Sequence, residues 1–197
     1  MTVGSAALLS DSLRRRVLAE QRYSSVACFV LGGALLVEAL THSPAVRQLL
    51  PPPLWYAAEA RVVSFALPLV ALATLWLLVR RRRVAVGLHP RGSGTGALAL
   101  AVLLAMVLTP LTVLLAGAGV WLGGALIAVG ARAKDLALVW TGLGVTVTAL
   151  WAAWQRFGDA TEAPAVALTV CAVAVLTLGA VRRRDERRTL AIASPDA

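Results

Sequence analysis

The amino-acid sequence predicts an all-α, polytopic integral membrane bundle of six transmembrane helices, with the N- and C-termini both cytoplasmic. The 197 residues are 59% hydrophobic and only 15% charged, with a mean hydropathy of +0.78, whereas soluble domains are about a quarter charged. Uncharged runs close to the ~20 residues that cross a bilayer recur along the chain. The charges gather between these runs, as in Arg80–Arg83 and Arg182–Arg188, which is the pattern of a chain that keeps charge out of lipid.

The N-terminal segment, residues 1–22, is polar and basic and is expected to lie in the cytoplasm. Its stretch "SDSLRRRVLAEQR" can form a short helix on the membrane surface. The apolar run that follows leads to "THSP" instead of a small-residue cleavage site, which favours a retained signal anchor. The first span is therefore predicted at about 23–40.

Five further spans complete the predicted transmembrane domain, residues 23–181. The second contains Pro68, which a membrane helix tolerates as a kink. A basic cytoplasmic tail, 182–197, follows the last span. The remaining spans are expected at about 62–79, 97–115, 118–131, 136–154 and 163–181.

The third and fourth spans come from one uncharged run, Ala97–Ala131. As a single straight helix this run would measure about 52 Å, well beyond ~30 Å of hydrocarbon. Two spans with a turn near Gly117–Gly119 fit better, and Trp121 then falls near the outer headgroups, where tryptophan is favoured. One full span plus a re-entrant segment remains an alternative for this run.

The distribution of basic residues favours six spans over five. With six spans and a cytoplasmic N-terminus, only Arg47, Arg61 and Arg156 of the 19 basic residues lie outside. With five spans the C-terminal arginines move outside and the two sides become nearly equal. Because cytoplasmic loops carry an excess of Lys and Arg, we expect six spans.

The charge and composition also indicate location and partners. The net charge of the chain is +9, and most of its basic residues are expected on cytoplasmic loops that face anionic lipid headgroups. Nucleic acid is not an expected partner, because no soluble segment is long enough to present a basic recognition face. Lys134 is the only lysine, and this arginine and alanine bias suggests a bacterial genome. The expected location is therefore the bacterial inner, or plasma, membrane.

Catalytic motifs are absent from the sequence. It contains no G-x-S-x-G, no H-E-x-x-H and no P-loop. Cys28 and Cys171 lie in apolar runs and have no metal-ligand spacing. We expect no enzymatic activity, no cofactor and no metal.

Glu38 is the only acidic residue within a predicted span, and an ionisable residue there is a candidate functional site. His42 follows four residues later, on the same face if the helix continues. This pair could bind a cation or relay a proton. The structural alternative is that Glu38 reaches the outer interface and pairs with Arg61. Glu38, His42 and Arg61 form the candidate polar site.

Small residues at four-residue spacing indicate faces where helices pack closely. These are Gly119 and Gly123 in the fourth span, Gly144 and Thr148 in the fifth, and Ala163 and Ala167 in the sixth. Packing within the chain is the simplest interpretation, and formation of a homo-oligomer is the alternative.

These features predict a small transport-related membrane protein or a permease subunit, because of Glu38 and the kinked second span. The alternative is a membrane accessory or scaffold protein that transports nothing and assembles with other membrane proteins. The scarcity of polar residues in the spans favours this alternative, since carriers usually contain several.

Overall fold

The computed structural model describes residues 24–43, 65–85, 110–155 and 162–193, and these residues form five helices and no strand. The helices are Ser24–Thr41, α4 (Leu67–Ala85), α6 (Pro110–Ala133), α7 (Leu136–Gln155) and α8 (Ala163–Ala193). Three helical segments are long and apolar enough to cross a membrane: Ser24–Thr41, Leu136–Gln155 and Ala163–Arg188. Gly117–Ala133 is a shorter apolar helix. The expected all-helical architecture is therefore confirmed for the described residues, and three of their helices are compatible with membrane spans.

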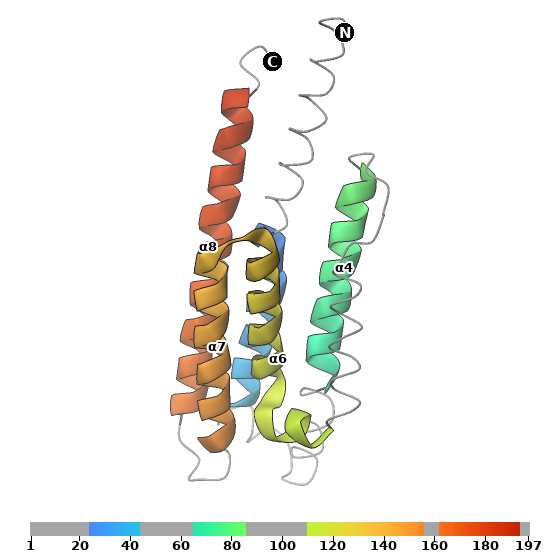
Figure 1. Cartoon of the computed structure of the whole chain (residues 1–197). Coiled ribbons are helices and arrows are strands. Elements are labelled where there is room, and N and C mark those ends of the chain that lie inside the picture. Colours follow the sequence, from blue (N-terminus) through green and yellow to red (C-terminus); the bar gives the residue numbers. More distant parts are fainter. Residues whose placement is uncertain (1–23, 44–64, 86–109, 156–161, 194–197) are drawn as a thin grey trace, which may run out of the picture.

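The helices run along one bundle axis in two directions (Figure 1). The α4, α6 and α8 helices point one way, and Ser24–Thr41 and α7 point the other way. Consequently the start of the first helix, the end of α4, the α6–α7 turn and the arginines of α8 all lie at one end of the bundle. We call this the basic end.

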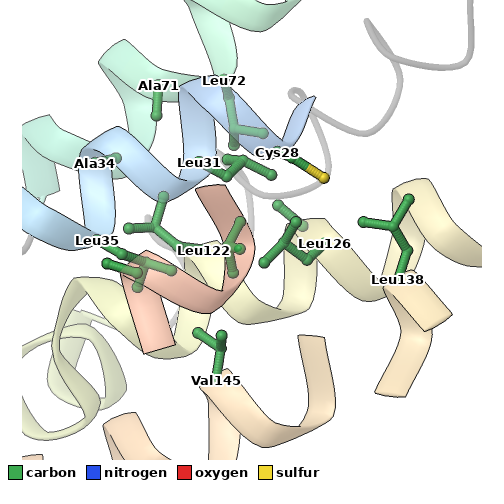
Figure 2. Packing of buried hydrophobic residues seen from close by; sticks show 13 residues of the cluster. Cys28, Leu31, Ala34, Leu35, Ala71, Leu72, Leu122, Leu126, Leu138 and Val145 are labelled. Carbon is green, nitrogen blue, oxygen red and sulfur yellow. The ribbon is translucent and has the colours of Figure 1, made fainter. Parts of the chain in front are cut away.

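Ser24–Thr41 is the central helix. Its membrane-length window is 67% buried, compared with 33% for α7 and 28% for α8. Leu31 and Leu35 belong to one buried cluster with residues of α4, α6, α7 and α8, and Figure 2 shows several of these side chains meeting around the central helix. The first helix of the chain therefore provides the surface on which the others assemble.

The outer surface of the bundle is apolar, and the α7 helix shows this most clearly. Its buried face consists mainly of small residues, including Gly142, Ala149 and Ala152. Its exposed face carries large ones, with Trp140 70% and Trp154 78% exposed. A soluble helix buries its large apolar residues in the core, whereas membrane helices place small residues where helices meet. The surface of α7 is thus suited to lipid.

Several threonine hydroxyls on α7 and α8 bond to the backbone of their own helix. Thr141 Oγ1 donates to the Ala137 carbonyl at 2.7 Å, and Thr169 Oγ1 donates to the Ala165 carbonyl at 2.7 Å. Both threonines are exposed or half-buried. A hydroxyl that faces lipid cannot bond to water, so this local bond avoids the cost of an unsatisfied polar group.

The α6–α7 turn closes the basic end. The Asp135 N–H donates to the Gly130 carbonyl (2.8 Å) and the Lys134 N–H donates to the Ala131 carbonyl (3.2 Å), which is the Schellman pattern. Lys134 takes the left-handed conformation, with φ 54°. Asp135 Oδ1 then accepts the N–H of Leu138 at 3.4 Å, as an N-cap does. Two antiparallel helices are thereby joined without a long loop.

Glycines allow α6 and α7 to approach closely. A Cβ built at Gly123 would lie 2.8 Å from the Thr146 nitrogen, and one built at Gly130 would lie 2.8 Å from the Val139 nitrogen. A Cβ at Gly142 would lie 2.9 Å from the Gly123 carbonyl oxygen. Because real Cβ atoms need more room, these positions hold backbone against backbone. We call Gly123, Gly130 and Gly142 the glycine seam.

The observed helices can be compared with the predicted spans. Helices Ser24–Thr41 and Leu136–Gln155 lie where spans 23–40 and 136–154 were expected. The α4 helix starts at Leu67 and continues through its arginines to Ala85. The expected N-terminal segment 1–22 lies outside the described residues, as do residues 97–109 of the expected span 97–115.

Candidate functional site

Glu38 and His42 lie at the end of the central helix that is far from the basic end. Glu38 is 2% exposed and His42 is 3% exposed. The helix closes there, because the His42 N–H donates to the Ala39 carbonyl (3.1 Å) and Thr41 Oγ1 donates to the Glu38 carbonyl (2.6 Å). Both side chains are turned into the bundle, away from its apolar outer surface.

The carboxylate of Glu38 lies against the backbone of α6. A Cβ built at Gly119 would lie 2.7 Å from Glu38 Oε2 and 2.7 Å from the Ala149 Cβ of α7. Any side chain at position 119 would therefore occupy the space that the carboxylate fills. Gly119 thus contributes room for an acidic group at the meeting point of three helices.

The α6 helix is broken two residues before this contact. Gly117 has φ 71° and ψ 176°, a backbone conformation that is essentially restricted to glycine. Figure 1 shows the part of α6 before Gly117 lying at an angle to the part that follows. Glu38 therefore packs beside the first turn of the helical segment Gly117–Ala133.

This position is electrostatically favourable for an anion. The N–H groups of a first helical turn have no partner within their helix, and the helix dipole places positive charge there. A carboxylate next to Gly119 lies in that field. Broken helices at membrane depth, with their half-helix termini turned to charged groups, occur at the binding sites of transporters.

Apolar side chains are buried in the same part of the bundle as Glu38. Ala39, Ala149 and Leu168 belong to one buried cluster, with Val120 packed against it. A carboxylate is costly to bury in such surroundings. Glu38 is therefore the buried ionisable residue that marks this end of the central helix as a candidate site.

Trp121 adds a polar group on the same helical segment. The residue is half-buried, and its buried indole N–H has no hydrogen-bond acceptor within the described part of the chain. From sequence, this residue was expected only as an interfacial anchor. Indole N–H groups usually find a partner when buried, so this donor is available to a bound group.

Arg61, the third member of the predicted polar site, lies outside the described residues. Among the residues that the structure describes, no group of three or more His, Cys, Asp or Glu side chains could hold a metal ion. Of the predicted polar site, the structure describes Glu38 and His42, and it places Glu38 against the α6 backbone at Gly119.

The predicted packing residues fall on different faces. Gly119 and Gly123 are buried against α7. A Cβ built at Gly144 would meet no atom within 4 Å, and Thr148 is half-buried on the same helix. Ala163 and Ala167 are exposed and half-buried. The close packing between α6 and α7 thus relies on α6 glycines and on Gly142.

A second polar cluster, at the basic end, was not anticipated from the sequence. Arg182 Nη2 lies 2.7 Å from Asp135 Oδ2, and the Asp135 side chain is only 9% exposed. Ser25 Oγ donates to Glu186 Oε2 at 3.2 Å. These contacts join the α6–α7 turn and the start of the central helix to α8. The one available signal was the acid Asp135 directly before an apolar run.

Comparison of the chain with protein-family models, with curated proteins and with solved structures gives no match.

Proposed function

We propose that the chain is a six-span membrane protein whose two termini lie on the cytoplasmic side. The described helices support this, because α4 and α6 run in the same direction. The excess of arginines at the basic end supports a cytoplasmic position for that end.

We further propose that the protein is a small transporter or permease subunit that uses Glu38 as its polar centre. The observation that carries this proposal is the burial of Glu38 beside the break of α6 at Gly117. A buried carboxylate beside a helix break is a candidate binding site for a proton or a cation. Binding there would change the charge of Glu38. The α6 segment that begins at Gly117 lies beside Glu38, so its position would respond to the change in charge.

The experiment compares Glu38→Gln with Glu162→Gln in proteoliposomes. Glu162 is an exposed residue that directly precedes α8, at the same end of the bundle, so Glu162→Gln is a matched control for loss of one acidic charge. A potassium diffusion potential drives transport, a trapped dye reports the internal pH, and small cationic and zwitterionic solutes are tested one at a time.

We expect the wild type and Glu162→Gln to move a solute or protons above the level of protein-free liposomes, and Glu38→Gln to fall to that level. Thermal unfolding and circular dichroism check that Glu38→Gln is folded like the wild type. Equal flux by both variants would rule out Glu38 as the transport centre.

The second candidate is an accessory protein that assembles with another membrane protein. The observation in its favour is the open position of Gly144 on the exposed side of α7, next to the partly exposed Thr148. A foreign helix could pack closely there. This candidate gains support if no tested solute is transported and a Gly144→Leu substitution releases a co-purifying membrane protein.

A further inference from the structure

The α8 helix extends well beyond the part that is apolar. It runs without a break from Ala163 to Ala193, and its uncharged part ends at Val181. The next seven residues, "RRRDERR", remain helical. A straight helix therefore carries a basic segment directly out of the apolar layer.

Two contacts fix how this basic segment is rotated. Arg182 bonds to Asp135 and Glu186 accepts a hydrogen bond from Ser25. Arg182 and Glu186 are both half-buried. Residues 182 and 186 are four apart and share one helical face, so this face of α8 is held against the bundle.

The opposite face presents arginines to the surroundings. Arg184, Arg187 and Arg188 are exposed, and we call these three residues the arginine face. At 100° per residue, Arg184 and Arg188 continue the line of the exposed Val170, Val173 and Val181. One side of α8 is therefore apolar along the span and basic immediately beyond it.

This face is not neutralised within the described part of the chain. No described residue forms an ion pair with Arg184, Arg187 or Arg188. Glu186 is turned inward, so that Asp185 is the one exposed acid of the segment. The net charge of the face is positive.

Neighbouring helices carry interfacial residues at the same end of the bundle. The Arg80 guanidinium lies 5.3 Å from the ring centroid of Trp76. Trp140, near the start of α7, is 70% exposed. Arg132 and Lys134 are exposed in the α6–α7 turn. Tryptophan and arginine gather at the level of lipid headgroups, so the arginine face lies at headgroup depth.

We propose that the arginine face binds the phosphate of an anionic phospholipid whose acyl chains lie along the valines of α8. Charge complementarity favours the phosphate, and the planar guanidinium matches its oxygens in a two-pronged geometry. The apolar stripe continues directly into the face, so one lipid molecule contacts both. This binding does not depend on the transport activity proposed above.

The test measures lipid binding to the full-length protein by native mass spectrometry in detergent. Phosphatidylglycerol and phosphatidylcholine are titrated separately against three proteins: the wild type, a triple variant with Arg184→Gln, Arg187→Gln and Arg188→Gln, and a triple variant with lysine at the same positions. Circular dichroism records the helix content of each protein.

We expect the wild type to prefer phosphatidylglycerol. Each basic residue near an anionic surface contributes roughly fivefold to binding, so the glutamine variant should lose roughly a hundredfold in phosphatidylglycerol affinity. The lysine variant keeps the charge but loses the two-pronged geometry, so its affinity should lie between those of the wild type and the glutamine variant. Phosphatidylcholine binding should be the same for all three proteins.

Equal binding of the two lipids by the wild type would overturn the proposal, as would an undiminished preference in the glutamine variant. If that variant does not fold, the salt dependence of the wild type decides. A preference based on these exposed charges must weaken as ionic strength rises from about 0.05 M to about 0.5 M, and a salt-independent preference would contradict the arginine face as its origin.

Discussion

Lys134 occupies a backbone position that ordinarily belongs to glycine. It is the residue after the last turn of α6, with φ 54°, where a side chain costs roughly 1–2 kcal/mol. The hydrogen bonds of Lys134 and Asp135 to the α6 carbonyls hold it there. The exposed ammonium group of Lys134 lies at the basic end. The strained backbone position therefore carries a positive charge, which favours the cytoplasmic side.

Replacement of Lys134 by glycine should stabilise the protein by about 1 kcal/mol, because glycine adopts this conformation without a steric cost. The measurement is thermal or denaturant unfolding in detergent. Lys134→Ala is the control, since it removes the same charge and keeps the strain. A glycine variant that is no more stable than the alanine variant would show that the turn is not strained.

Between elements, the glycine seam determines how closely α6 and α7 approach. Gly123 lies on the seam, where a Cβ would meet the Thr146 hydroxyl and backbone nitrogen. Gly144 lies on α7 with no atom within 4 Å of a built Cβ. The two glycines thus have opposite packing surroundings on adjoining helices.

Gly123→Ala should lower the free energy of unfolding by about 1–3 kcal/mol, because the added methyl group forces the two backbones apart. Gly144→Ala should leave it unchanged or raise it by up to about 1 kcal/mol, since alanine is the better helix former. Unfolding in detergent measures both variants. Similar effects of the two substitutions would mean that α6 and α7 do not pack through this seam.

At the scale of the whole molecule, the helix directions place the two candidate regions at opposite ends. Glu38 lies at one end, and the Asp135–Arg182 ion pair lies at the other. Ser24–Thr41 runs from the basic end to the end that holds Glu38. If the bundle crosses the membrane as proposed, Glu38 lies close to the outer side.

The topology is tested with single cysteines in a background that carries Cys28→Ala and Cys171→Ala. Lys134→Cys and Arg188→Cys should react with a membrane-impermeant maleimide only after the cells are permeabilised. Glu162→Cys should react in intact cells, because it lies at the opposite end of the bundle. Labelling of Arg188→Cys in intact cells would contradict a cytoplasmic C-terminus.

Much of the helical architecture could be predicted because crossing a lipid bilayer imposes a simple requirement on the sequence. A span must be long and uncharged, so the charged residues between apolar runs indicated where helices Ser24–Thr41 and Leu136–Gln155 lie. The α8 helix continues past its predicted span because arginine, glutamate and alanine are good helix formers in water as well. Hydropathy thus predicts the membrane-crossing part of a helix but not the residue at which the helix ends.

The candidate site could be predicted only in part. Glu38 and His42 stood out because ionisable residues are rare in spans. The contact of Glu38 with Gly119 could not be predicted, since it joins residues far apart in the chain and depends on how the helices rotate. The same holds for Asp135 and Arg182, which are 47 positions apart.

The sequence by itself determined that this chain forms apolar helices and where its basic residues gather, because both follow from the cost of placing charge in lipid. The tertiary structure decided which residues lie inside. It buried Glu38 in the space left by Gly119, next to the broken turn at Gly117, and it rotated α8 so that Arg182 faces inward and Arg184 outward. Lipid and the bundle interior are both apolar, so hydropathy cannot distinguish the two faces of a helix, and only close packing does so.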